Sequence, residues 1–266
     1  MRFAAARLGL LVQSYDGELV TVVGRFAGTV ALDELFARCR AVDRVRWPAM
    51  VLEAFDRIAR SVEIGPALRH WATAAPLLRT RVVTEGSLLV EEAVGRPFGD
   101  GLIEILVADA GGAVTPLSPT LVAGWDMPVD ELFRRGRAAV LDHELPSVRS
   151  LDLGPVTALV LETPTVFAAV HLHALPAYAD IGAAGALVAL PTRHLVLVVT
   201  ITGRSQALDA AQALLVNAEL LEGESPAPLS PDLWWWRAGV LVRLPGTPTD
   251  LRPPRAFLDM LGELGS

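Results

Sequence analysis

The sequence has one cysteine, no lysine and few aromatic residues among its 266 positions. Because Cys39 has no second cysteine to pair with, no disulfide can form within the chain, which favours a reducing, cytoplasmic location. All 23 basic residues are arginine, against 30 acidic residues and a net charge of -7. Proteins that bind nucleic acid usually display clustered positive charge, so we expect no nucleic-acid partner.

Long uncharged hydrophobic runs are also missing. A helix that crosses a bilayer needs roughly 20 apolar residues, and Arg, Asp or Glu interrupts every hydrophobic block before that length. The uncharged stretch near the start ends at Asp16, too early for the core of a secretory signal. We therefore expect neither membrane insertion nor secretion.

Apolar residues are abundant, at 52% of the chain, which is ample for a packed core. Two apolar runs, residues 185–191 and 195–201, are separated only by a short turn. Each run is too apolar for a strand with one face in water, so both faces must be covered. We predict an antiparallel hairpin of Ala186–Leu190 and Leu195–Thr200 in the middle of a buried sheet.

The remaining periodicity predicts clusters of strands and helices rather than strict alternation. Tight turns between strands exclude parallel crossovers, so the predicted class is α+β, with a mainly antiparallel sheet, an N-terminal hairpin and helices packed on it. We expect one body over residues 1–266, with a soft boundary near Pro76. The expected strands are 8–14, 18–23, 77–84, 87–94, 102–109, 156–162, 233–237 and 240–244, and the expected helices are 31–42, 48–62, 128–145, 166–175, 205–221 and 256–264.

His171 and His173 form the one His-x-His pair of the sequence. On a strand both rings would lie on one face and could share a metal, whereas on a helix they diverge. Residues 163–165 can cap the start of a helix and Pro176 can end it. We therefore expect a helix on which one imidazole is packed and the other exposed.

Trp234, Trp235 and Trp236 are the most unusual local composition in the chain. On a strand one face of this run enters the core, and the other exposes at least one indole that can anchor a partner. The alternative is that the proline-rich loops 225–232 and 245–254 cover both faces.

Asp109, Trp125 and Arg193 are a second candidate binding set, lining a groove at strand ends with Asp109 and Arg193 as an ion pair. The sequence has no Gly-x-Ser-x-Gly motif, and its glycine-rich pieces do not continue as nucleotide-binding loops. We expect no catalytic triad and no cofactor.

Three features taken in chain order resemble the YtpQ-like family, a family of bacterial proteins of unknown function. They are the strand Leu106–Asp109 followed by Leu121–Trp125, the segment Thr165–Leu172, and the run Gly185–Pro191. The resemblance covers about Leu77 to Pro245 and implies an α+β cytoplasmic protein without an assigned activity. The chain departs from the family at Val166–Ala169, where relatives look more polar, so no ligand role is carried over to that helix.

These observations predict a non-catalytic binding or protein-interaction protein that uses the Trp234–Trp236 hairpin as its contact surface. Its partner would be another protein or a second copy of the chain, joined at an edge strand or at that hairpin. The alternative is a metal-dependent or acid-base hydrolase. Its site would combine His171, His173 and His143 with a carboxylate, Asp180 or Asp142.

Overall fold

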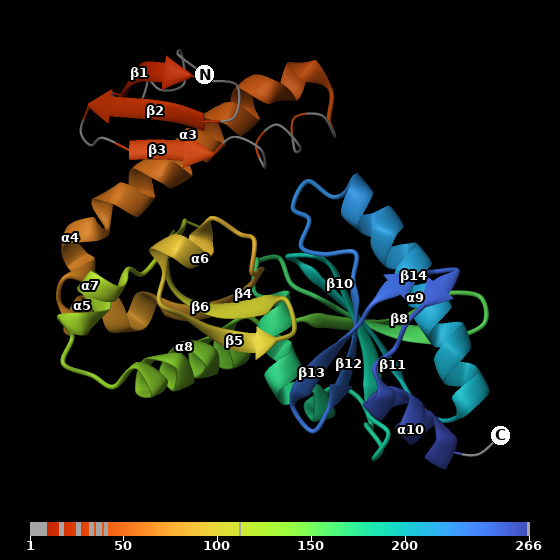
Figure 1. The fold of residues 1–266 in the computed structure, drawn as a ribbon. Helices are drawn as coiled ribbons and strands as arrows, with labels where there is room; N and C mark the ends of the chain where they lie inside the picture. Colours follow the sequence, from red (N-terminus) through yellow and green to blue (C-terminus); the bar gives the residue numbers. More distant parts are fainter. Residues whose placement is uncertain are drawn as a thin grey trace. The chain divides into compact units, whose positions relative to one another are not determined.

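The computed structural model describes residues 10–15, 19–24, 28–31, 35, 39, 42–111 and 113–264 (Figure 1). The chain divides into two compact units. The first consists of Met1–Leu77, Ala108–Thr115 and Ser225–Ala227. The second consists of Leu78–Val107, Pro116–Glu224 and Pro228–Ser266.

The first unit contains a three-stranded antiparallel sheet in the order β1-β2-β3. The predicted N-terminal hairpin is confirmed as the pairing of β1 with β2, and its turn at residues 16–18 lies outside the described residues. The predicted helix 48–62 is confirmed as α3, whereas Ala31, the predicted start of a helix, ends β3. The elements are β1 (Leu10–Tyr15), β2 (Leu19–Gly24), β3 (Gly28–Ala31), η1 (Arg44–Arg46), α3 (Trp47–Glu63), α4 (Gly65–Leu68), α5 (Trp71–Ala74) and η2 (Ala75–Leu77).

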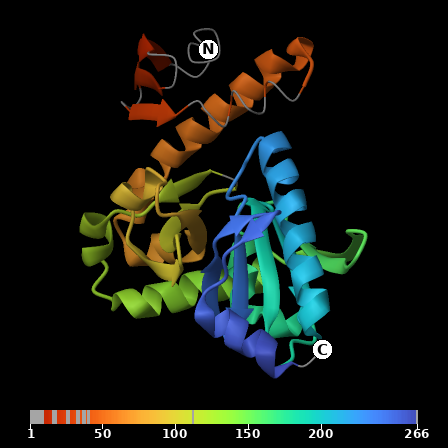
Figure 2. The ribbon, with the colours of Figure 1, turned by 45° about the vertical axis from the view of Figure 1, so that its right-hand side comes forward.

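The second unit is built on a six-stranded antiparallel sheet in the order β13-β12-β10-β11-β9-β8. Figure 2 shows its teal and blue strands next to a long light-blue helix. The predicted hairpin is confirmed at its centre, since β10 and β11 are flanked by β12 and β9 and are almost wholly buried. The strands are β8 (Ser147–Asp152), β9 (Thr157–Glu162), β10 (Ala186–Thr192), β11 (Leu195–Thr200), β12 (Leu233–Arg237) and β13 (Val240–Leu244). Sequence analysis missed β8, whose residues are mostly exposed and lack an apolar face.

Helix α9 (Arg204–Glu224) covers one face of this sheet, and α10 (Arg255–Glu263) joins the same core. Small side chains let α9 lie close to β10, because Ala207, Ala210 and Ala211 are fully or almost fully buried there. Phe257 of α10 packs edge-on against Trp235, with ring centroids 5.4 Å apart. A two-stranded ribbon, β14 (Gly246–Thr247) with β15 (Asp250–Leu251), precedes α10.

The three tryptophans of β12 are buried, and each indole N–H donates to a backbone carbonyl. Trp235 bonds to Ala184, whereas Trp234 bonds to Asp100 and Trp236 to Leu172. Both faces of the strand are therefore covered, and the prediction of an exposed indole is wrong. Other segments cover the faces of β12, Phe257 of α10 on Trp235 and the segment around Leu172 on Trp236, so these large aromatic residues fill the core instead of forming a contact surface.

A smaller antiparallel sheet, in the order β4-β6-β5, completes the second unit, and α8 packs on β4. Gly136 allows this close approach, since a Cβ there would lie 2.9 Å from the carbonyl carbon of Arg79. Residues 87–94 contain the short helix α6, so the predicted strand there is wrong, and β5 was missed. The elements are β4 (Leu78–Thr84), α6 (Leu89–Glu92), β5 (Gly95–Gly99), β6 (Leu102–Asp109), β7 (Val114–Pro116), α7 (Pro119–Ala123) and α8 (Val129–His143).

The predicted helix 166–175 is instead a 3-10 segment, η3 (Ala168–Ala177). The backbone of η3 departs from helical dihedral angles at Ala174. Pro176 also lies inside η3, and because proline has no backbone N–H it cannot donate a helical hydrogen bond. This segment contacts β4, α8 and β11 and brings its two histidines into the second unit.

Replacement of Gly185 by alanine tests the packing of the central hairpin. Gly185 precedes β10 with φ of +82°, and a Cβ there would lie 2.2 Å from the carbonyl oxygen of Trp236. We expect Gly185→Ala to lower the free energy of unfolding by about 2 kcal/mol or more, measured by urea denaturation. Gly182→Ala is the matched control, because nothing lies within 4 Å of its Cβ position. Equal stability of the two variants would contradict this packing.

Candidate functional site

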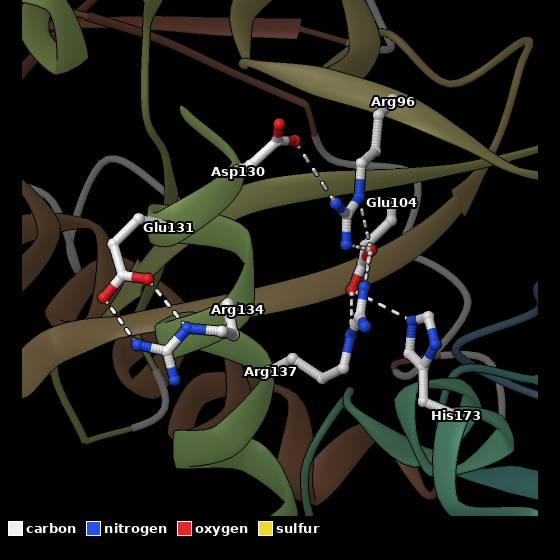
Figure 3. Close-up of polar contacts among 7 residues, drawn as sticks. All are labelled: Arg96, Glu104, Asp130, Glu131, Arg134, Arg137 and His173. Carbon is white, nitrogen blue, oxygen red and sulfur yellow. Dashed lines mark hydrogen bonds and ion pairs between the residues drawn. The ribbon is translucent and has the colours of Figure 1, made fainter. Parts of the chain in front are cut away.

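One buried carboxylate stands out among the charged groups of the second unit. Glu104 lies on β6, and its side chain is only 1% exposed. Its Oε2 atom accepts hydrogen bonds from Nε and Nη2 of Arg96, at 2.9 and 2.8 Å, and from Nη2 of Arg137, at 3.0 Å (Figure 3). Its Oε1 atom lies 3.3 Å from Nε2 of His173. These four residues are called the Glu104 cluster below.

Two strands of the smaller sheet, the helix α8 and the segment η3 place the members of the Glu104 cluster. Arg96 is directly opposite Glu104 in the pairing of β5 with β6, so both side chains lie on one face of the sheet. Arg137 follows Gly136, where α8 approaches β4 most closely. His173 comes from η3, which also contacts α8. Three separate elements, β5, α8 and η3, thus converge on the carboxylate carried by β6.

Aromatic rings contact two members of the Glu104 cluster, Arg96 and His173. The Arg96 guanidinium lies over the Phe133 ring, 4.1 Å from its centroid, and the Phe98 ring packs edge-on against His173 at 4.9 Å. The outer side of Arg96 faces Asp130, where Nη1 and Oδ1 are 3.9 Å apart. Because the Asp130 side chain is 99% exposed, this contact is solvated and weak.

The environment of Glu104 favours its ionised form. Burial raises the pKa of the carboxyl, but the hydrogen bond with His173 and the charges of His173 and Arg96 outweigh burial. The net effect is a pKa below the ordinary 4.5. Arg96 and Arg137 remain partly exposed, at 30% and 26% of their side chains. The Glu104 cluster therefore joins a buried anion to cations that reach solvent.

A second ion-pair group lies on the surface of α8. Glu131 accepts hydrogen bonds from Arg134 (Figure 3) and from Arg135. These bonds lower the pKa of Glu131 to about 2. Because Arg134 and Arg135 are about half exposed or more, water competes with these pairs. This group provides a natural control for the Glu104 cluster.

The two histidines of the His-x-His pair diverge, as predicted for a helical segment. His171 is fully buried, with Nε2 3.0 Å from the carbonyl oxygen of Glu144 and Nδ1 2.8 Å from the hydroxyl of Tyr178. Since a carbonyl can only accept, Nε2 carries the proton and the Tyr178 hydroxyl donates to Nδ1. Burial lowers the pKa of His171, which keeps this imidazole neutral. His173 instead turns towards the Glu104 cluster.

The residues proposed for a hydrolase do not assemble into a metal site. Within the described ranges, no group of three or more His, Cys, Asp or Glu side chains could hold a metal ion. Both ring nitrogens of His171 are engaged, while Asp142 and His143 are exposed at the end of α8. The metal-dependent alternative therefore lacks a ligand set in this part of the chain.

The groove predicted from Asp109, Trp125 and Arg193 is not assembled within one unit. Asp109 ends β6 and belongs to the first unit, whereas Trp125 and Arg193 belong to the second. Trp125 is buried, and Arg193 lies half-buried in the turn between β10 and β11. The proposed ion pair of Asp109 with Arg193 stays a prediction.

Sequence analysis did not identify the Glu104 cluster. The available signal was the pair of Arg96 and Glu104 on either side of the turn at Gly99–Gly101, a spacing that a short hairpin brings into register. Gly95, Pro97 and Gly99 weakened this segment as a strand.

Comparisons with protein-family models, curated proteins and solved structures give no match to this chain. The resemblance to the YtpQ-like family therefore stays a prediction. None of the helices in the described part of the chain has both the length and the apolar character needed to cross a lipid bilayer.

Replacement of Glu104 by glutamine tests whether the buried charge holds the second unit together. Gln keeps the size of the side chain but leaves Arg96 and Arg137 without their anionic partner, so we expect a loss of about 2 to 3 kcal/mol at pH 7 in urea denaturation. Because the pKa of Glu104 is lowered, its contribution is complete above pH 4.5 and disappears as the pH falls through the folded-state pKa.

Glu131→Gln is the matched control for this substitution, because it also removes a carboxylate that pairs with two arginines. We expect a much smaller loss of stability than in Glu104→Gln, because water already competes with the exposed pairs of Glu131. Equal losses in the two variants would mean that burial does not strengthen the contribution of Glu104.

Proposed function

We propose that this chain is a non-catalytic binding protein whose ligand is a small anion held by Arg96 and Arg137. The observation that supports the proposal is the charge balance of the Glu104 cluster. Two permanent guanidinium charges meet one buried carboxylate, which leaves one positive charge in excess before His173 is counted. Asp130 neutralises little of this excess because it is almost fully solvated.

Preorganisation is the second argument for an anion site. Glu104 and the Phe133 ring hold the Arg96 side chain in one position, so a ligand need not order it. Nε and Nη2 of Arg96 bond to Glu104, while among the described residues Nη1 makes only the long contact with Asp130. A carboxylate or phosphate oxygen is the natural acceptor for such a donor.

Binding without catalysis fits the chemistry of these groups. Arginine stays protonated in proteins and does not act as an acid or base near neutral pH. Glu104 is the anion that holds both arginines, and protonation would release them. The Glu104 cluster is thus suited to recognising negative charge.

We also propose that the protein is cytoplasmic and bacterial. A single cysteine suits a reducing compartment, and Cys39 is buried. The bacterial origin rests on the resemblance of Leu77–Pro245 to the YtpQ-like family.

A second candidate function is pairing with a protein through the sheet edge at β8. This strand ends the order of the six-stranded sheet, and no further strand pairs with it in the described residues. Its side chains are mostly exposed, including Val148 at 47%. An open edge offers unpaired backbone groups to another chain, and the simplest partner is a second copy in antiparallel pairing.

Anion titration tests the first proposal. We expect phosphate and acetate to shift backbone amide signals around Arg96 and Arg137 in heteronuclear NMR, with Arg137→Gln weakening the affinity at least about tenfold. Arg134→Gln is the control, because it removes an exposed arginine from the same helix and should leave the affinity unchanged. Equal affinities of the two variants would exclude the Glu104 cluster as the site.

Light scattering after size-exclusion chromatography tests the pairing at β8. We expect the dimer fraction to rise with concentration, and Val148→Asp to abolish it by placing charge on the edge. Val240→Asp, at an exposed position on the opposite edge strand β13, should leave the dimer intact. A monomer at every concentration would rule out this candidate.

A further inference from the structure

A shallow pocket in the second unit is lined by residues that include the chain neighbours of Arg96 and Asp130. It has a volume of about 360 Å³, within the range of small-molecule sites. Ala93 and Val122 form its buried floor, while other residues leave it open to solvent. Its lining is formed by Ala93, Val94, Gly95, Pro119, Val122, Ala123, Met127 and Val129.

The chain links this pocket to the outer side of Arg96 at two points. Gly95 in the pocket wall directly precedes Arg96, and Val129 directly precedes Asp130. Arg96 and Asp130 in turn form the long ion pair of 3.9 Å, drawn in Figure 3. Because side chains alternate along a strand, Gly95 and Arg96 face opposite sides of the smaller sheet. The wall is therefore connected to the Arg96 guanidinium through Val129 and its neighbour Asp130 at the start of α8.

We propose that the ligand is a monocarboxylate with an apolar tail, such as a medium-chain fatty acid. Its carboxylate meets Nη1 of Arg96 and replaces the solvated Asp130 side chain, while its tail lies against Val122 and Val129. No lining residue carries a charge, so the pocket itself favours an apolar group, and the Glu104 cluster supplies the complementary charge. This inference rests on the proposed anion site and specifies its ligand.

Other ligands would use only one of the two features, the Arg96 donor or the apolar wall of the pocket. Inorganic phosphate would use the arginines and leave the apolar wall empty. An uncharged alcohol of the same length would use the wall and leave Arg96 without an anion. A carboxylate with a tail is the ligand that uses both.

The experiment compares acetate, hexanoate, octanoate and octanol by calorimetry with the full chain. We expect affinity to rise about two- to threefold for each added methylene until the pocket is filled, because each methylene leaves water. Octanol should bind at least about tenfold more weakly than octanoate, since it lacks the charge that Arg96 recognises.

Two variants separate the tail from the head group. Ala123→Trp places a bulky ring at an exposed position of the pocket wall, so octanoate affinity should fall to that of acetate while phosphate binding is unchanged. Ala256→Trp, at an exposed alanine of α10 outside the lining, should change neither affinity.

The outcomes distinguish this inference from the proposed function. If octanoate binds no more tightly than acetate while both bind at Arg96 and Arg137, the tail site is overturned and the anion site stands. Retention of octanoate affinity in Ala123→Trp would also overturn the tail site. If no anion binds, both proposals fail.

Discussion

The ionised carboxylate of Glu104 is the constraint on which the second unit depends. A charge removed from water must be compensated within hydrogen-bonding distance, and here the compensation comes from β5, α8 and η3. These partners lie on elements far apart in the chain, with His173 69 residues from Glu104. One buried charge thus fixes the relative placement of a strand, a helix and a 3-10 segment.

Close backbone packing makes this convergence possible. Gly136 lets α8 lie against β4, which brings Arg137 to the sheet. On the larger sheet, β12 is secured by the three indole N–H groups, each bonded to a carbonyl of a different segment. Trp236 donates to Leu172, next to His173, so the packing of the large sheet also positions the segment that completes the Glu104 cluster. The fold and the candidate site share these contacts.

Much of the fold was predictable because its signals are local. Two uninterrupted apolar runs predict the central hairpin. In α8 and α9 the apolar residues recur at helical spacing, between residues that are typical of helix ends. β5 and η3 were not predictable in the same way, since Gly, Pro and a mid-segment kink obscure the period. The Glu104 cluster was missed for a further reason. Its four residues form a cluster only after tertiary packing brings them together. Taken singly in the sequence, a Glu or Arg in a strand indicates a side chain exposed to solvent.

The tryptophan run shows the opposite error. The unusual composition suggested a contact surface, but other segments cover both faces of β12, and its three indoles lie in the core. The proposed function therefore depends on charged residues that are partly buried, and not on the aromatic residues that are conspicuous in the sequence.

The most direct test of this account is the pKa of Glu104. Carbon-13 NMR titration of the glutamate side-chain carboxyls, with the Glu104 signal assigned by its loss in Glu104→Gln, reports that value in the folded protein. The account predicts a pKa below 4.5, because the cations around Glu104 outweigh the effect of burial. A pKa above 4.5 would mean that Glu104 is a desolvated acid without adequate partners, and would contradict the preorganised arginine pair.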